Sequence, residues 1–251
     1  MKGFWRVLET TFAIAAIVVA WDLYTRYCDI PDFLLPSPVS VWNALVEAAK
    51  GQLFDHLLYT ITILVSGYVV GVVLGIASGL VLAKSARLER WLSGPILFLQ
   101  TAPKIALAPL FVIWFGLGIT SKLILIVSLV FFPVLIATLV GIRSVDKRLH
   151  DLAQVLHLSL WQRFRRIEFP SALPEIFIGL RVGAVQAVVG AILAEWMAGK
   201  QGLGYLMTFA TATYKTPLLF GAVIVTALLG IAVYQIIDFV ERRLLSWREQ
   251  P

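Results

Sequence analysis

Three ionisable side chains lie inside long apolar stretches of this 251-residue chain, where an isolated charge is costly. Lys104 lies between Pro103 and Pro109, and Arg181 and Glu195 share a later apolar run. In a membrane such groups pair with one another, hold unwound backbone, or face the path of a solute or ion. The sequence therefore predicts that these three side chains either line a transport pathway or have a structural pairing role.

Enzyme chemistry has no comparable signal in the sequence. The chain contains no G-x-x-x-x-G-K-[ST] phosphate loop, no H-E-x-x-H motif and no G-x-S-x-G elbow. Its three histidines, His56, His150 and His157, are scattered and have no triad partner close in sequence. We expect no catalytic residue, no metal site and no bound cofactor in this chain.

The composition is that of an integral membrane protein. Hydrophobic residues make up 59% of the chain and charged residues only 14%, and the mean hydropathy is +0.87. Crossing the hydrocarbon takes about 20 mostly apolar residues, and runs of that length favour helices over barrel strands. We expect an all-α polytopic fold, one transmembrane domain over residues 1–251, with about six spans: Val7–Tyr27, Leu57–Ala83, Leu92–Phe115, Leu123–Ile142, Pro174–Met197 and Leu218–Ile237.

The distribution of Lys and Arg predicts the orientation of these spans. One set of connections holds fourteen basic residues, six of them between Arg143 and Arg166, whereas the alternate set holds four. By the positive-inside rule, both termini and the Arg143–Arg166 loop lie in the cytoplasm. An even number of spans meets this requirement.

Small residues and prolines mark how the spans pack and where they bend. Small side chains at four-residue spacing let helix backbones approach closely, which indicates close packing of the spans. The alternative interpretation is a helix face that slides during transport. Prolines within spans predict kinks or breaks. The small residues are Gly67, Gly71, Gly75 and Gly79 in the second span and Gly179, Gly183, Ala187 and Ala191 in the fifth, and the prolines are Pro103, Pro109 and Pro133.

Two segments outside the spans have helical patterns. Ser37 followed by Pro38 predicts the start of a short amphipathic helix on the outer face. In the Arg143–Glu175 loop, Ser159 and Gln162 have the spacing of a capping box. The loop is expected to hold two short helices, the second with an apolar face of Trp161, Phe164 and Ile167 and ended by Pro170 and Pro174. Such helices either dock another protein or rest on anionic lipid.

The loop also carries a family resemblance. Asp151-Leu-Ala-Gln-Val-Leu-His157-Leu-Ser159, continuing through Phe164 to Pro174, resembles the EAA loop in the permease subunits of bacterial ABC importers. Further matches to the nitrate, sulfonate and taurine branch are Leu35-Pro-Ser-Pro38, Trp114-Phe-Gly-Leu-Gly118 and Gly202-Leu-Gly204. The resemblance covers the chain from about residue 36 to the last span.

The resemblance implies the partners and the roles of the loop residues. It implies that this chain lies in the bacterial inner membrane. The implied partners are a pair of separate ATP-binding subunits that hold ATP and magnesium, a second permease chain, most simply an identical copy, and a periplasmic substrate-binding protein. The residues implied to couple to the ATP-binding subunit are Asp151, Ala153, His157, Ser159, Trp161, Phe164, Ile167 and Pro170.

One departure from the family pattern bears on the geometry of the loop. His157 stands where the family has a glycine, at a turn that favours a positive φ. Histidine tolerates that conformation less well than glycine but better than most residues. Either the turn is rearranged or His157 itself contacts the partner.

The hypothesis is therefore the transmembrane permease subunit of an ATP-driven importer for a small solute. The resemblance leaves open a sulfonate, a nitrate-like anion, an aromatic compound or a vitamin precursor. The alternatives are a secondary transporter driven by an ion gradient, which would call for inverted repeats and buried carboxylates near the midplane, and a membrane-embedded enzyme or scaffold.

Overall fold

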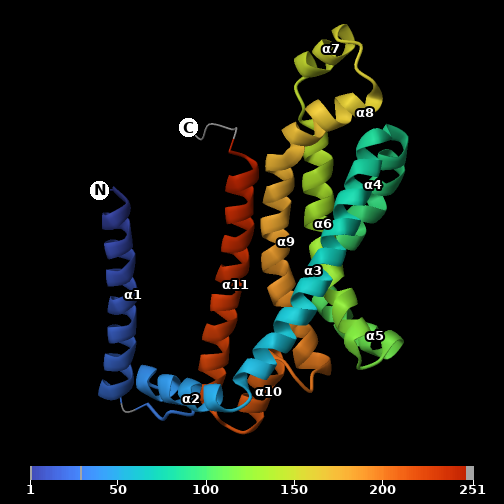
Figure 1. The fold of residues 1–251 in the computed structure, drawn as a ribbon. Helices are drawn as coiled ribbons and strands as arrows, with labels where there is room; N and C mark the ends of the chain where they lie inside the picture. The colour runs from blue at the N-terminus through green and yellow to red at the C-terminus, as the bar shows by residue number, and fades with distance from the viewer. Residues whose placement is uncertain (1, 29, 247–251) are drawn as a thin grey trace.

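The structure, a computed structural model, describes residues 2–28 and 30–246, and every regular element among them is helical (Figure 1). The predicted all-α fold is confirmed. The elements in chain order are α1 (Lys2–Tyr27), α2 (Pro38–Lys50), α3 (Leu53–Lys84), α4 (Ala86–Thr101), α5 (Lys104–Phe115), α6 (Ile119–Arg143), α7 (Lys147–Val155), α8 (Leu160–Arg163), the π-helix η1 (Phe164–Glu168), α9 (Phe169–Ala198), α10 (Leu203–Ala212) and α11 (Thr216–Leu244).

The described part of the chain contains four helices long and apolar enough to cross a membrane, against the six spans expected. They are α3, α6, α11 and the continuous helix Leu160–Ala198, which contains α9. A fifth span is available if the bent pair α4 and α5 is taken as one. The predicted first span lies within α1, which is not among these helices.

The proline-rich third span is bent by 91° between α4 and α5. The break falls at Ala102, whose ψ of 135° is the extended conformation favoured before a proline, and at Pro103. Pro109 and Pro133 lie inside α5 and α6 without ending them. Of the three prolines singled out from the sequence, only Pro103 marks a break.

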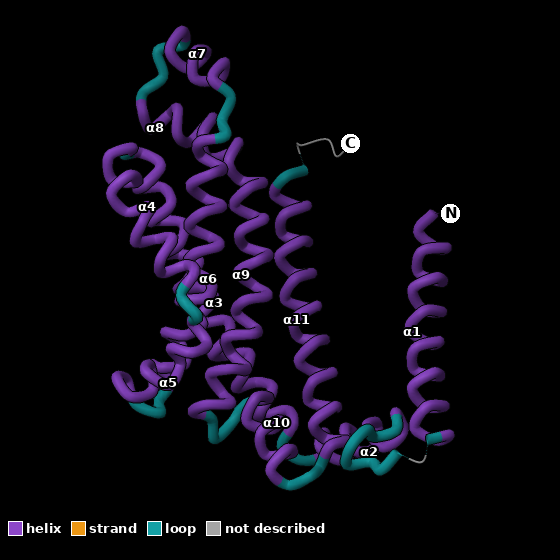
Figure 2. Tube along the Cα trace, turned by 180° about the vertical axis from the view of Figure 1, so that it is seen from behind, coloured by secondary structure: helices purple, strands orange, loops and turns teal. Residues whose placement is uncertain are grey.

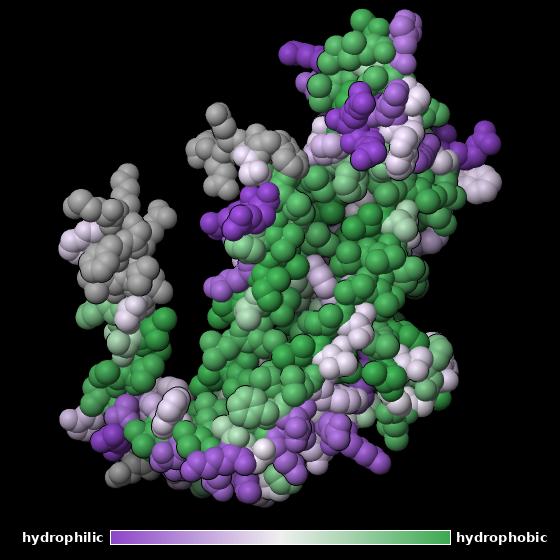
Figure 3. All heavy atoms as spheres, in the orientation of Figure 1, coloured by the Kyte–Doolittle hydropathy of each residue, from purple (hydrophilic) through white to green (hydrophobic). Residues whose placement is uncertain are grey.

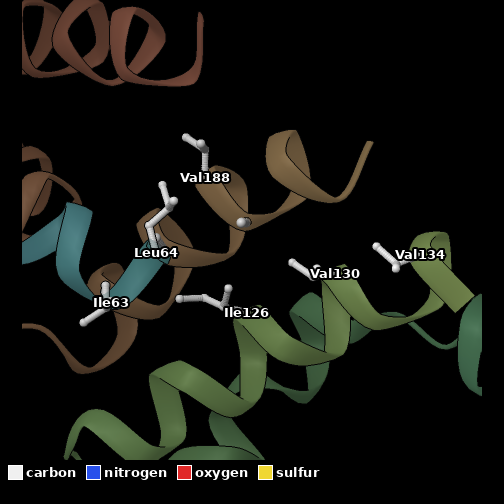
Figure 4. Close-up of a cluster of buried hydrophobic side chains, with 8 residues drawn as sticks. Ile63, Leu64, Ile126, Val130, Val134 and Val188 are labelled. Carbon is white, nitrogen blue, oxygen red and sulfur yellow. The ribbon is translucent and has the colours of Figure 1, made fainter. Parts of the chain in front are cut away.

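The helices α3, α6 and α9 form the centre of the bundle. Ile63 and Leu64 of α3 meet Ile126 and Val130 of α6 and Val188 of α9 in a fully buried cluster (Figure 4). The small-residue faces allow this contact, because a Cβ added at Gly67 would lie 2.6 Å from Ile126 Cγ2. Close packing by these faces is thus confirmed.

The two ends of the bundle are built differently (Figures 1 and 2). At one end α7 and α8 project beyond the long helices, while α2, α10 and the far end of α5 close the other. The outer helix begins as predicted, with the Ser37 hydroxyl accepting from Ser40 N at 3.1 Å. The visible surface is hydrophobic over a broad middle zone, and hydrophilic residues gather toward both ends (Figure 3).

Helix α1 stands beside the bundle and joins it near its C-terminal end (Figures 1 and 2). There the rings of Trp21 and Phe220 lie 5.9 Å apart. Arg26 Nε pairs with Asp22 Oδ2 one turn earlier in the same helix, at 2.8 Å. Phe12 and Ile17 are 75% and 68% exposed, so the apolar surface of α1 is largely uncovered by the rest of the chain.

Candidate functional site

The loop between α6 and α9 folds as two short helices joined by a tight turn. Asp146 caps α7 by accepting from Arg148 N at 2.9 Å. The predicted capping box begins α8, because Ser159 and Gln162 exchange side-chain and backbone hydrogen bonds of 2.9 and 3.3 Å. The sequence therefore placed both the helices and the turn between them.

His157 occupies the left-handed position of that turn, with φ at 48°. Its N–H donates to Gln154 O and the next amide, Leu158 N, donates to Ala153 O, both at 3.0 Å. This pair of bonds is the Schellman motif that usually has glycine at the left-handed residue. The turn keeps the geometry of a glycine turn although a histidine occupies it, and the His157 side chain is exposed.

The second helix does not end at the prolines, contrary to the sequence prediction. It passes through the π-helical turn η1 into α9, and Phe169 N–H donates to Phe164 O. Pro170 and Pro174 are both taken into this continuous helix, directly after the π turn. The Arg163 guanidinium bridges the π turn to Glu168 at 2.6 Å.

The loop residues divide into an exposed tip and an anchored base. At the tip Val155, Leu160 and Trp161 are 75%, 83% and 67% exposed. At the base Phe164 is half-buried against Trp161 and Phe169, and Lys84 Nζ lies 5.2 Å from its ring centroid. The remaining predicted coupling residues are exposed at Asp151 and Ser159, buried at Ala153, and half-buried at Ile167 and Pro170.

The three ionisable residues predicted from the sequence all have internal partners. Lys104 Nζ, at the start of α5, donates to Gln100 O in the last turn of α4 at 2.7 Å, across the break between the two helices. Arg181 of α9 pairs with Glu241 of α11 at 2.8 Å. The structural roles left open by the sequence are present, and pathway lining by these residues stays a prediction.

Glu195 belongs to a buried cap on α10 that the sequence did not reveal. The first amides of α10 have no capping side chain of their own, and three consecutive N–H groups instead find acceptors on other helices. Gly202 N donates to His56 Nδ1 at 3.1 Å, Leu203 N to Thr60 Oγ1 at 2.8 Å, and Gly204 N to Glu195 Oε2 at 2.7 Å. The carboxylate faces the positive end of the α10 dipole.

Glycines make room for this carboxylate, which is only 1% exposed. Gly202 has φ at +109°, and a Cβ there would collide with the Glu195 carboxylate. Thr60 Oγ1 also donates to Glu195 Oε1 at 2.7 Å, so α3, α9 and α10 meet in one network. The Gly202-Leu-Gly204 motif is explained by this packing.

Lys122 is a second residue that sequence reasoning missed, because the fourth span was predicted to begin at Leu123 and α6 begins at Ile119. Its side chain is buried at 4% exposure. Its ammonium donates to Tyr59 Oη at 2.9 Å and lies 4.8 Å from the centroid of that ring. No signal within the sequence marks the burial, since Tyr59 is 63 residues away.

A bundle of long apolar helices with a structured loop at one end is the architecture of a polytopic membrane protein. Residues 71–246 match the binding-protein-dependent transport system inner membrane component family, and the chain belongs to it. It is thus the transmembrane permease subunit of an ABC importer in the inner membrane.

Individual relatives support the same conclusion. The chain is 34% identical over 250 residues to the formylaminopyrimidine transport permease protein of Halalkalibacterium halodurans, covering 100% of both. It is 34% identical to the putative aliphatic sulfonates transport permease protein of Bacillus subtilis, covering 93% of this chain and 85% of that one. The fold matches a crystal structure of an amino acid ABC transporter with histidines, with a TM-score of 0.63, 18% identity, and coverage of 85% of this chain and 99% of that one.

Proposed function

We propose that two copies of this chain form the translocation pathway of an importer and that each copy receives a separate ATP-binding subunit on the tip of the α7–α8 loop. ATP and magnesium are held by that subunit. The observation that carries the proposal is the exposed apolar tip of Val155, Leu160 and Trp161, on helices that project beyond the bundle (Figure 1). Large apolar side chains gathered in this way mark a surface that another protein covers.

The anchored base supports a role in force transfer. Phe164 is packed against Phe169, the first residue of α9, and Glu168 is bonded to Arg163 across the π turn. His150 Nδ1 of α7 lies 3.9 Å from the same Glu168 carboxylate. A push on the tip would therefore reach α9 through packed and ion-paired groups.

The projection of the tip favours a protein partner over a lipid surface. Helices that rest on lipid headgroups lie in the plane of the membrane at the ends of the spans. Here α7 lies farther out than the ends of α6 and α9 (Figures 1 and 2), so its exposed residues point into the aqueous phase. The anionic-lipid alternative is the less favoured one.

The orientation follows from the same proposal. The loop with six basic residues and both termini lie on the cytoplasmic side. The end formed by α2 and α10 then faces the periplasm, where a substrate-binding protein docks. Relatives named for a formylaminopyrimidine and for aliphatic sulfonates support a small polar organic cargo.

The structure sharpens the experiment that tests the coupling role. Phe164→Asp would disturb the half-buried base as well as any partner, whereas Val155→Asp changes a side chain that touches little of its own chain. The matched control is Val39→Asp, on α2 at the opposite end, where the valine is 53% exposed. Both variants are expected to fold, and co-purification of the ATP-binding subunit and ATPase activity of the complex are measured.

We expect Val155→Asp to abolish recovery of the ATP-binding subunit and Val39→Asp to leave it unchanged. Burying the new, unpaired carboxylate in an interface costs several kcal/mol, and even about 2 kcal/mol lowers the affinity roughly 30-fold. Undiminished recovery with Val155→Asp and with the companion Leu160→Asp would show that the tip is not the docking surface.

A further inference from the structure

A cavity lies at the end of the bundle opposite the α7–α8 loop, between the start of α6 and the segment that follows α9. Its volume is about 470 Å³, and its polar lining comes from Tyr59 of α3, Lys122 of α6, and Lys200 and Gln201. Gly118 and Ile119, at the start of α6, complete one side of it. Two lysines therefore converge on one cavity from different parts of the chain.

Lys122 is an unusual cation because it is buried and only partly satisfied. An ammonium has three N–H donors, and the described residues provide one acceptor for them, Tyr59 Oη at 2.9 Å. Among the described residues no carboxylate oxygen lies within ion-pair distance of Lys122 Nζ. Burying a charge without paired partners costs several kcal/mol, so two unused donors beside a cavity indicate a place for an acceptor.

The nearby carboxylate does not fill that place. Glu195 is close enough for its charge to interact with that of Lys122, but its oxygens already accept from Thr60 and Gly204. Lys122 and the exposed Lys200 both border the cavity, and no carboxylate is among the residues that line it. An anion in the cavity would face two cations and no competing acid.

The start of α6 adds a second attraction for negative charge. The helix is 25 residues long, and its N-cap is Gly118, which has no side chain to accept from the first amides. Free N–H groups and the positive end of a helix dipole bind anions well. Here they border the same cavity as the buried lysine.

We propose that this cavity binds the oxyanion head of the cargo, a carboxylate, sulfonate or phosphate carried on a small organic body. The head would lie between Lys122 Nζ and the first amides of α6, with Lys200 at the rim and the apolar part against Leu117 and Met197. That the bound anion is the transported solute rests on the proposed function. That the cavity binds an anion rests on the cavity alone. It selects the anionic cargos from those that the family resemblance left open.

The test uses the full chain in nanodiscs of zwitterionic lipid, with ethanesulfonate as the probe and ethanesulfonamide as its neutral counterpart. At constant ionic strength in sodium chloride, ethanesulfonate is expected to raise the melting temperature saturably, and ethanesulfonamide to leave it unchanged. Lys122→Gln is expected to raise the half-saturating concentration by about 10- to 100-fold, the usual range for losing a hydrogen bond to a charged group.

Two further variants keep the test decisive if Lys122→Gln does not fold. Lys200→Gln changes an exposed side chain at the rim and is expected to weaken the effect several-fold. Lys215→Gln removes a positive charge at the same end of the protein, outside this cavity, and is expected to have no effect. A shift that is equal for the sulfonate and the sulfonamide, or that both lysine variants retain in full, overturns the proposal.

A lipid headgroup offers the same chemistry, so the experiment is repeated in nanodiscs that contain phosphatidylglycerol. If stabilisation that depends on Lys122 comes from this lipid and the sulfonate adds nothing in either nanodisc, the cavity binds a headgroup and the proposal for the cargo is wrong. None of these measurements involves the ATP-binding subunit. A failed docking experiment and a failed anion experiment are therefore distinguishable.

Discussion

Glu195 offers the sharpest prediction, because its carboxylate caps α10 from another helix. Glu195→Ala removes the acceptor of Gly204 N and a partner of Thr60 Oγ1, both at 2.7 Å, in a site that is 1% exposed. Hydrogen bonds to a charged group contribute about 1.5–3 kcal/mol each. The two together give an expected loss of about 3–6 kcal/mol in the local stability of the α10 start.

Glu195→Gln should cost much less, for a reason visible in the hydrogen-bond pattern. The glutamine Oε1 can still accept from Gly204 N, while its NH2 group donates to Thr60 Oγ1. The Thr60 hydroxyl proton can then go entirely to His56 O, which lies 3.1 Å away in the present structure. Both hydrogen bonds survive without the charge, so the loss should be about 1–2 kcal/mol.

Amide hydrogen exchange at Leu203 and Gly204 measures this local stability. Each 1.4 kcal/mol of local stability that is lost raises the exchange rate tenfold. The amides of the alanine variant should therefore exchange at least about 100-fold faster, and those of the glutamine variant roughly 5- to 30-fold faster. Amides of α6 near Val134, in the centre of the bundle, serve as the internal control. Equal and small effects of the two substitutions would falsify the assignment of Glu195 as the cap of α10.

Other predictions concern packing, the loop and an ion pair. His157→Gly should retain the turn and slow hydrogen exchange of the Leu158 amide, because a φ of 48° costs a residue with a Cβ about 1 kcal/mol. His157→Val should speed the exchange of the same amide several-fold. Gly67→Leu should lower the melting temperature by roughly 5 °C or more, since even a Cβ there meets Ile126 at 2.6 Å, with exposed Gly94→Leu as the control. Arg181→Met should leave the Glu241 carboxylate unpaired and lower the melting temperature. The double variant Arg181→Met, Glu241→Gln should lower it less, and a double-mutant cycle measures the difference.

The features predicted well from the sequence are those that neighbouring residues decide. The Ser159 capping box and the Ser37 cap each depend on a few consecutive positions. The four-residue repeat beginning at Gly67 could also be recognised in the sequence, because residues four positions apart lie on the same face of a helix. Local chemistry was therefore a sound guide to the loop and to the packing faces.

The features that the sequence missed depend on contacts between distant segments. The cap of α10 joins His56 to Gly202 and Thr60 to Leu203, residues that are 146 and 143 positions apart. Lys122 was counted as part of a polar connection because the apolar run begins after it, yet α6 starts at Ile119 and carries it inward against Tyr59. Pro170 and Pro174 were expected to end a helix, but the π turn before them lets the helix continue.

That continuity gives the permease a direct mechanical connection between its two ends. Leu160–Ala198 is one uninterrupted helix of 39 residues, about 58 Å at 1.5 Å per residue, and it carries the exposed Leu160 and Trp161 at one end and Glu195 near the other. Along the way Arg181 binds it to α11 and Gly179 lets it pack closely on α6. A tilt imposed on the loop by an ATP-binding subunit would thus move the carboxylate that caps α10 and, beside it, the wall of the Lys122 cavity. Under the proposed function, one movement of this helix end would therefore act on both the α10 cap and the Lys122 cavity.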